Sequence, residues 1–69
     1  MSYFVLVLTL FFEGQTSVYE YGVRGATVQF PTKAACEKVL TTEKTEVPKN
    51  LPPGAEVRSL RCVERQAGI

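Results

Sequence analysis

The 69-residue chain contains no histidine, no aspartate and no tryptophan, and it has only two cysteines. Histidine is the commonest general base in enzymes and the commonest metal ligand, so the usual means of activating a cysteine or completing a zinc site is missing. The seven glutamates are scattered, and no two of them form a recognisable catalytic pair. The sequence therefore predicts a protein that is not an enzyme, with no catalytic residue, no cofactor and no metal site.

The chain also lacks a strong net charge and a long apolar run. Eight lysines and arginines against seven glutamates give a net charge of +1, which by itself indicates neither nucleic acid nor an anionic membrane as a partner. The apolar run 3–12 has about half of the roughly 20 residues that a membrane span needs, and no lysine or arginine precedes it as in a signal peptide. We therefore expect a cytoplasmic protein that does not associate with a membrane.

The small size and the cysteine count leave two questions open. At 69 residues the chain forms a single domain, residues 1–69, whose core alone gives marginal stability, and association is a common remedy. Cys36 and Cys62 fit two buried reduced thiols, and they also fit one disulfide across a core, which would favour a secreted protein. The composition does not choose between these states.

The first half of the chain has the pattern of a β-hairpin. The segment 3–12 is apolar at both alternating sets of positions, and the polar, glycine-containing stretch 13–16 predicts a hairpin turn after it. A second strand is expected over about 17–29. Two glycines interrupt it within 22–25, which predicts a bulge or a bend there, with close approach of a ligand to the backbone as the alternative.

The second half predicts a helix and a third strand. Thr32 is a good N-cap for a helix that begins at Lys33 and reaches Leu40 or Glu43, because its apolar residues recur at spacings of three and four. The polar stretch 41–50, with Pro48, is expected to be a long surface connection. The third strand covers about 55–64. Its apolar residues are odd-numbered before residues 58 and 59 and even-numbered just after them, which predicts a bulge there in preference to partial cover of both faces.

These elements predict an α+β fold of the order β-β-α-β. The most apolar strand is placed in the centre of a three-stranded antiparallel sheet, in the strand order 2-1-3, with the helix packed on its even-numbered face. The odd-numbered face is then expected to lie bare as an apolar patch. Such a patch predicts a partner protein, either a second copy in a homodimer or a client. The predicted interface residues are Tyr3, Val5, Val7, Phe11, Tyr19 and Tyr21.

Arginine gives an alternative reading of the same sheet. Arg58, Arg61 and Arg65 fall within eight residues of the third strand, and Arg24 is expected near the opposite edge. Arginines beside exposed tyrosines can bind single-stranded nucleic acid through phosphate contacts and base stacking. The simpler interpretation is a charged edge strand that resists aggregation. Nucleic-acid binding is therefore the second functional hypothesis, after protein binding.

The order of elements carries one resemblance. A short apolar opening strand, a hairpin, the helix start Phe30-Pro31-Thr32-Lys33-Ala34-Ala35-Cys36-Glu37 and a last strand bearing Cys62 make the chain similar to small orphan proteins of phage and proteobacterial genomes. The resemblance spans most of the chain. It implies a phage or mobile-element accessory protein, and hence an inhibitor of a host protein, such as an anti-CRISPR or another anti-defence protein.

Overall fold

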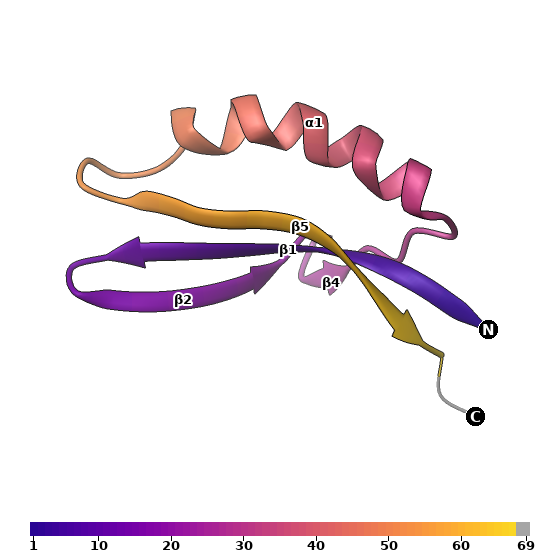
Figure 1. Ribbon diagram of the computed structural model, residues 1–69. Helices are drawn as coiled ribbons and strands as arrows, with labels where there is room; N and C mark the ends of the chain where they lie inside the picture. The colour runs from indigo at the N-terminus through magenta and orange to yellow at the C-terminus, as the bar shows by residue number, and fades with distance from the viewer. Residues whose placement is uncertain (68–69) are drawn as a thin grey trace.

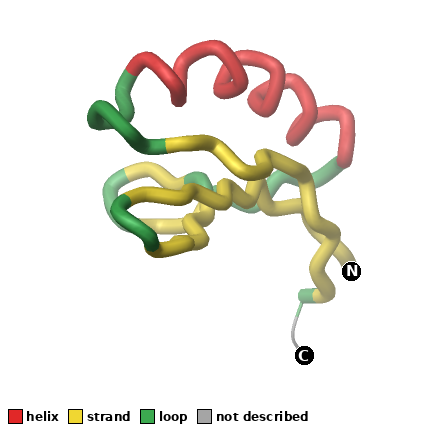
Figure 2. Tube along the Cα trace, turned by 60° about the vertical axis from the view of Figure 1, so that its left-hand side comes forward, coloured by secondary structure: helices red, strands yellow, loops and turns green. Residues whose placement is uncertain are grey.

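A computed structural model describes residues 1–67 of the chain, which form an antiparallel sheet with one long helix on one of its faces (Figures 1 and 2). The three-stranded sheet has the order β2-β1-β5, with the apolar strand β1 in the centre. This confirms the α+β fold and the strand order expected from the sequence. In chain order the elements are β1 (Ser2–Phe12), β2 (Gln15–Glu20), β3 (Gly22–Val23), β4 (Ala26–Thr27), α1 (Lys33–Lys49) and β5 (Glu56–Gln66).

The turn between β1 and β2 is a two-residue hairpin loop. Phe12 pairs directly with Gln15, and the residues between them, Glu13 and Gly14, have φ angles of 51° and 78°. Positive φ at both central positions defines the type I′ turn, whose twist matches that of the flanking strands. The predicted hairpin is confirmed, with a shorter loop than the stretch 13–16.

The second strand is shorter than expected, because it ends at Glu20 instead of residue 29. A separate two-stranded hairpin, β3 with β4, follows it in place of the predicted bulge. Its turn residues Arg24 and Gly25 both have positive φ, 54° and 83°, so the chain reverses fully there. At its base a Cβ on Gly22 would lie 2.4 Å from the carbonyl oxygen of Ala26, so only glycine fits. The glycines therefore mark a hairpin, not a bulge.

After this small hairpin the chain returns to the edge of β1. Phe30 and Phe4 exchange two backbone hydrogen bonds, each 2.8 Å long, and both residues contribute to the core on the helix side of the sheet. Thr32 then caps α1, because its Oγ1 accepts a hydrogen bond from the backbone N–H of Ala35 at 3.1 Å. The predicted N-cap is confirmed.

Helix α1 is longer than predicted. It runs over 17 residues to Lys49, so the interpretation of 41–50 as a surface connection is wrong. Val39, Leu40 and Val47 are each half-buried, and Val47 lies seven residues after Leu40, which keeps it on the packed face of the helix. Tertiary packing of this face thus extends the helix through a polar stretch whose own propensity is ordinary.

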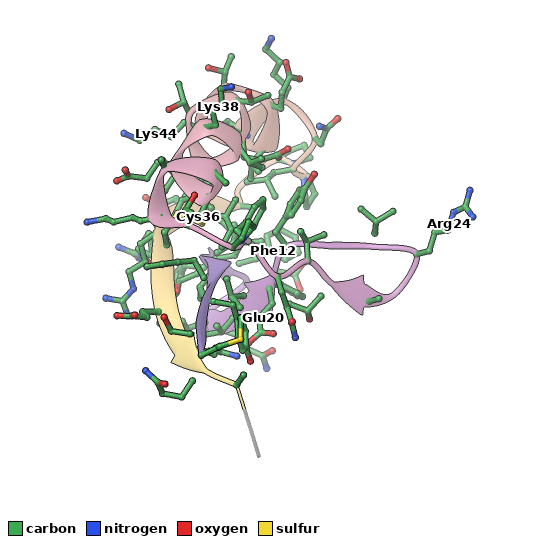
Figure 3. The ribbon with its side chains drawn as sticks, turned by 90° about the vertical axis from the view of Figure 1, so that its right-hand side faces the viewer. Phe12, Glu20, Arg24, Cys36, Lys38 and Lys44 are labelled. Carbon is green, nitrogen blue, oxygen red and sulfur yellow. A yellow bond between two sulfur atoms is a disulfide. The ribbon has the colours of Figure 1, made fainter. Side chains whose placement is uncertain are left out.

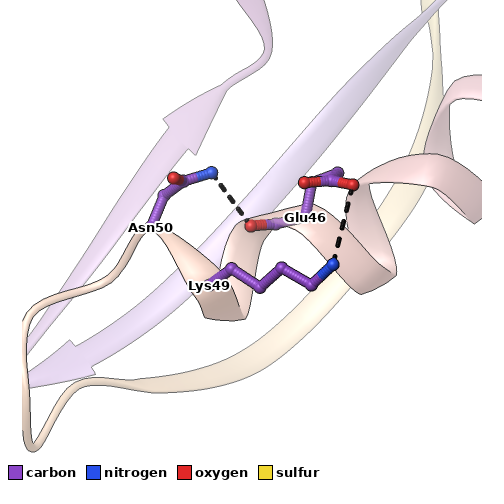
Figure 4. Close-up of polar contacts among 3 residues, drawn as sticks. All are labelled: Glu46, Lys49 and Asn50. Carbon is purple, nitrogen blue, oxygen red and sulfur yellow. Dashed lines mark hydrogen bonds and ion pairs between the residues drawn. The ribbon is translucent and has the colours of Figure 1, made fainter.

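The C-terminal end of α1 follows from Pro48 and from Asn50, whose polar contact with Glu46 is drawn in Figure 4. A proline in the last turn removes one backbone donor, and the helix ends one residue later. The side-chain Nδ2 of Asn50 donates to the carbonyl oxygen of Glu46 at 3.0 Å, and its backbone N–H donates to Val47 at 3.0 Å. Lys49 adds a weak ion pair, with its Nζ 4.0 Å from Oε1 of Glu46.

Strand β5 contains the predicted bulge. Ser59 lies opposite Thr9, whereas Val57 lies opposite Leu10, so Arg58 is the extra residue. Because of this extra residue, odd-numbered residues before the bulge share a face of the sheet with even-numbered residues after it. Val57 therefore lies on the same face as Leu60. The imperfect alternation in the sequence was therefore a correct sign of a bulge at this position.

The core lies between α1 and the sheet and contains a disulfide. Its fully enclosed members are Leu6, at 1% exposure, and Cys36, at 0%. Cys36 of α1 is bonded to Cys62 of β5, which lies opposite Leu6, and the two Cα atoms are 6.1 Å apart. The bridge joins the beginning of the helix to the last strand, 26 residues away in sequence. The bridged state, one of the two left open by the sequence, is the one observed.

Candidate interaction surfaces

The sheet has two faces with different coverings. Residues directly opposite one another in an antiparallel pair project to the same face, so the register assigns every strand residue to one side. Leu6 and the other even-numbered residues of β1 lie on the face that α1 covers, here called the helix side. The odd-numbered residues lie on the other face, here called the open side.

The open side is not the bare apolar patch expected from the sequence. Val5 is 1% exposed and Val7 is 7% exposed, although no helix lies over them. Glu20 of β2 lies opposite Val7 on this face. Arg65 of β5 lies opposite Tyr3, and its Nη1 is 2.5 Å from Oε2 of Glu20. Because Glu20 and Arg65 come from the two strands that flank β1, their ion pair crosses β1 and shields the valines between them.

The far end of the open side has a similar cover. The guanidinium of Arg58, the bulged residue, lies 4.6 Å from the centre of the Phe11 ring, and this contact is a cation-π interaction. The same guanidinium pairs with Glu56 at 3.5 Å. Phe11 and Tyr3 are half-buried. The four predicted interface residues on β1 therefore share one face. Two of them, Val5 and Val7, are buried, and Phe11 lies under the guanidinium of Arg58.

The two predicted tyrosines lie on the opposite face from those four residues. Tyr19 is directly opposite Leu8, which places it on the helix side, where it is 54% exposed. Tyr21 packs against the core, and its ring lies 6.2 Å from that of Phe30 in a stacked arrangement. The length of the hairpin loop carries a signal for this face. When a loop with an even number of residues follows Phe12, odd-numbered residues of β2 lie opposite even-numbered residues of β1 and share their face. The prediction of a single six-residue patch is wrong in this respect.

The predicted arginine cluster is also divided. Arg58, Arg61 and Arg65 lie along β5, and the first and last of these are in ion pairs with glutamates. Arg24 lies at the tip of the β3-β4 hairpin and extends away from the rest of the molecule (Figure 3). Within residues 1–67, Arg61 is thus the member of the β5 trio that has no ion-pair partner.

The helix side contains a groove that sequence reasoning missed. Helix α1 packs on β5 and β1, so the part of this face near β2 has no helix above it. A hollow of about 120 Å³ opens there between the C-terminal half of α1 and β2. The groove, as we call it, is lined by Leu6, Leu8, Tyr19, Glu20, Tyr21, Glu43, Val47 and Leu60. The sequence patterns do not predict this groove, because they place Val47 in a loop and Tyr19 on the other face.

A wider hollow continues the groove toward the β1-β2 turn. Its volume is about 410 Å³, and it lies between the ends of β1 and β2 and the loop that joins α1 to β5. Tyr19 lines both hollows and therefore stands where they meet. Apolar contributions to the wider hollow come from Leu10 and Phe12 on one side and from Leu51 and Pro52 on the other.

The described part of the chain shows no group of three or more His, Cys, Asp or Glu residues placed to hold a metal ion. Both cysteines are in the disulfide, so neither carries a thiol in this state. Among the described residues, no helix is both long enough and apolar enough to cross a membrane.

Comparison with known proteins identifies no relative. No protein-family model, no curated protein and no solved structure matches this chain. The resemblance to small phage and proteobacterial proteins therefore stays a prediction.

Proposed function

We propose that this protein is a non-enzymatic binding module whose groove receives an apolar segment of another protein. The observation that carries the proposal is the position of Tyr19. Its side chain is 54% exposed next to Leu8, Val47 and Leu60, in a hollow that α1 leaves uncovered. Apolar surface of this kind on a small soluble protein is a common sign of a protein interface.

The chemistry of the groove suits recognition of a peptide segment. Tyrosine offers a large apolar ring and a hydroxyl on a side chain with few rotatable bonds, and it is enriched among residues that dominate binding energy. The floor consists of leucines on rigid strands, so little ordering is needed when a partner binds. Glu43 of α1 also lines the groove and favours a partner with lysine or arginine beside its apolar residues, whereas the carboxylate of Glu20 lies on the open side with Arg65.

Two settings for this activity follow from the sequence and the disulfide. The resemblance to small phage proteins supports a host protein as the client and inhibition as the outcome of binding. The disulfide Cys36–Cys62 supports an oxidising compartment as the place of action, because buried structural bridges are rarely kept in the cytosol. It counts against the cytoplasmic location expected from the sequence.

Nucleic-acid binding receives less support from the geometry. Arg58 and Arg65 are already engaged by Glu56 and Glu20, and Arg24 extends from a separate hairpin. The tyrosine that is most exposed, Tyr19, lies on the face opposite to the β5 arginines. A surface that combined stacking with phosphate contacts would need these groups on one side.

Affinity capture with matched variants tests the proposal. The bait proteins are the wild type, Tyr19→Arg in the groove, and Val23→Arg on β3, where Val23 is 55% exposed and outside the groove. We expect at least one protein that the wild type and Val23→Arg retain and that Tyr19→Arg loses, and titration with that purified protein should reproduce the difference. Equal capture by all three baits, or no capture by any, would show that the groove is not a binding site.

A further inference from the structure

The two edges of the sheet differ in how well they are protected from pairing with another strand. β5 carries a bulge at Arg58 and further charges at Glu56, Arg61, Glu64 and Arg65, all of which discourage edge-to-edge association. β2 has no lysine, no proline and no bulge, and Glu20 is its one charged residue. It also carries two large exposed apolar side chains, Val18 at 64% and Tyr19 at 54%. β2 is therefore the open edge.

The backbone groups that β2 presents to solvent follow from its register. Phe12 and Gln15 flank a two-residue turn and form a hydrogen-bonded pair, so every second residue of β2 bonds to β1. The series ends with the backbone N–H of Tyr21, which donates to Leu6 at 2.8 Å. The residues in between, Thr16, Val18 and Glu20, must direct their N–H and C=O groups away from β1. These groups are the ones available to another strand.

We propose that a second copy of this chain pairs with β2 through these groups, antiparallel and centred on Val18. In this register Val18 faces Val18 of the second copy across the two-fold axis, and Thr16 faces the second copy's Glu20. Each of these residues can then exchange both of its outward hydrogen bonds. The two sheets become one continuous six-stranded sheet.

The side chains of β2 are self-complementary in this register. The exposed valines meet each other on the open side, and on the helix side Tyr19 lies opposite the second copy's Ser17. No like charges face each other, because each Glu20 is opposite a threonine. A register centred on Glu20 would place two carboxylates together, and one centred on Thr16 would bring the turn at Gly14 against Val18. Val18 is therefore the favoured centre.

The pairing is short, so a weak dimer in rapid exchange with monomer is expected. Only three residues per copy form backbone hydrogen bonds to the other copy. So short a pairing buries much less surface than a standard stable interface. The proposal does not depend on the groove, because it uses the edge of β2, whereas the groove lies between β2 and α1. A failure of one proposal therefore leaves the other testable.

Sedimentation equilibrium over a wide concentration range is the first measurement. We expect the mass of the oxidised wild type to rise toward that of a dimer with increasing concentration. Val18→Lys, which would place two cations opposite each other, should weaken association by at least tenfold, while Val23→Lys on the separate hairpin should leave it unchanged. A wild type that is monomeric throughout, or a dimer that Val18→Lys leaves intact, would overturn the proposal.

Cross-linking then tests the register. Val18→Cys places two thiols across the axis, where Cα atoms of a hydrogen-bonded pair are about 5.5 Å apart and a disulfide can form. Thr16→Cys places them about four residue spacings apart along the strands, roughly 13 Å, which is too far. We expect a covalent dimer from Val18→Cys in glutathione buffer and none from Thr16→Cys. Equal yields from both, or no covalent dimer from either, would refute this register, and circular dichroism checks that each variant is folded.

Discussion

Breaking the Cys36–Cys62 disulfide should remove a large share of the stability of this protein. The bridge closes a chain segment of 26 residues. For a loop of that length, the chain-entropy relation gives about 12 cal/mol/K, or ~3.5 kcal/mol at 25 °C. A 69-residue domain at ordinary stability per residue has a free energy of unfolding of roughly 3.5–10 kcal/mol. Opening the bridge is therefore expected to remove between about a third and all of the free energy of unfolding.

Urea unfolding with and without reductant measures this cost. The reduced wild type keeps both sulfur atoms, so the change in its free energy of unfolding reports the loss of the cross-link with little change in core volume. The double variant Cys36→Ala, Cys62→Ala should be at least as unstable as the reduced wild type, because it also leaves space in the core at Cys36. Reductant should have no effect on this variant, which controls for other actions of the reagent.

If reduction changes the free energy of unfolding by less than about 1 kcal/mol, loop closure is not a major source of stability here. A large effect would support the oxidising compartment argued above, because the reduced chain would then be partly unfolded at physiological temperature.

Three smaller predictions concern single positions, all measured by urea unfolding of the oxidised protein. Thr32→Ala should cost about 1 kcal/mol, because the N–H of Ala35 loses its capping oxygen; a loss below the error would contradict the cap. Glu13→Asn should stabilise by up to about 1 kcal/mol, since Asn tolerates the φ of 51° better; a destabilised variant would count against the type I′ turn. Leu6→Ala should cost roughly 2–5 kcal/mol because its site is enclosed, whereas Val18→Ala at an exposed edge should stay within about 0.5 kcal/mol; similar losses at both would contradict the assigned core.

The features that the sequence predicted correctly are those with a local cause. The hairpin turn, the cap at Thr32 and the bulge at Arg58 each depend on residues within a few positions of one another. The central place of β1 followed from its apolar residues on both faces. Each of these signals needs only turn chemistry, capping or alternation, which neighbouring residues supply.

Of the features that were predicted wrongly, the length of α1 and the groove depend on contacts between distant segments, whereas the face of Tyr19 depends on the length of the hairpin loop. α1 extends to Lys49 with Val47 half-buried on the same helix face as Leu40, and the polar residues before Val47 give no local sign of this. The face of Tyr19 was readable from the even length of the hairpin loop, but the prediction did not use that parity. The groove depends on both facts, so it was missed when both were misassigned.

The sequence by itself determined the α+β class, the strand order and the start of the helix, because periodicity and caps act over a single turn or strand. The tertiary structure alone decided that Cys36 meets Cys62 and that Glu20 meets Arg65 over Val5. These pairs join residues 26 or more positions apart, and only strand register and helix docking bring them together. The surfaces on which binding depends are of the second kind, since a groove or a covered face exists only once separate elements have packed.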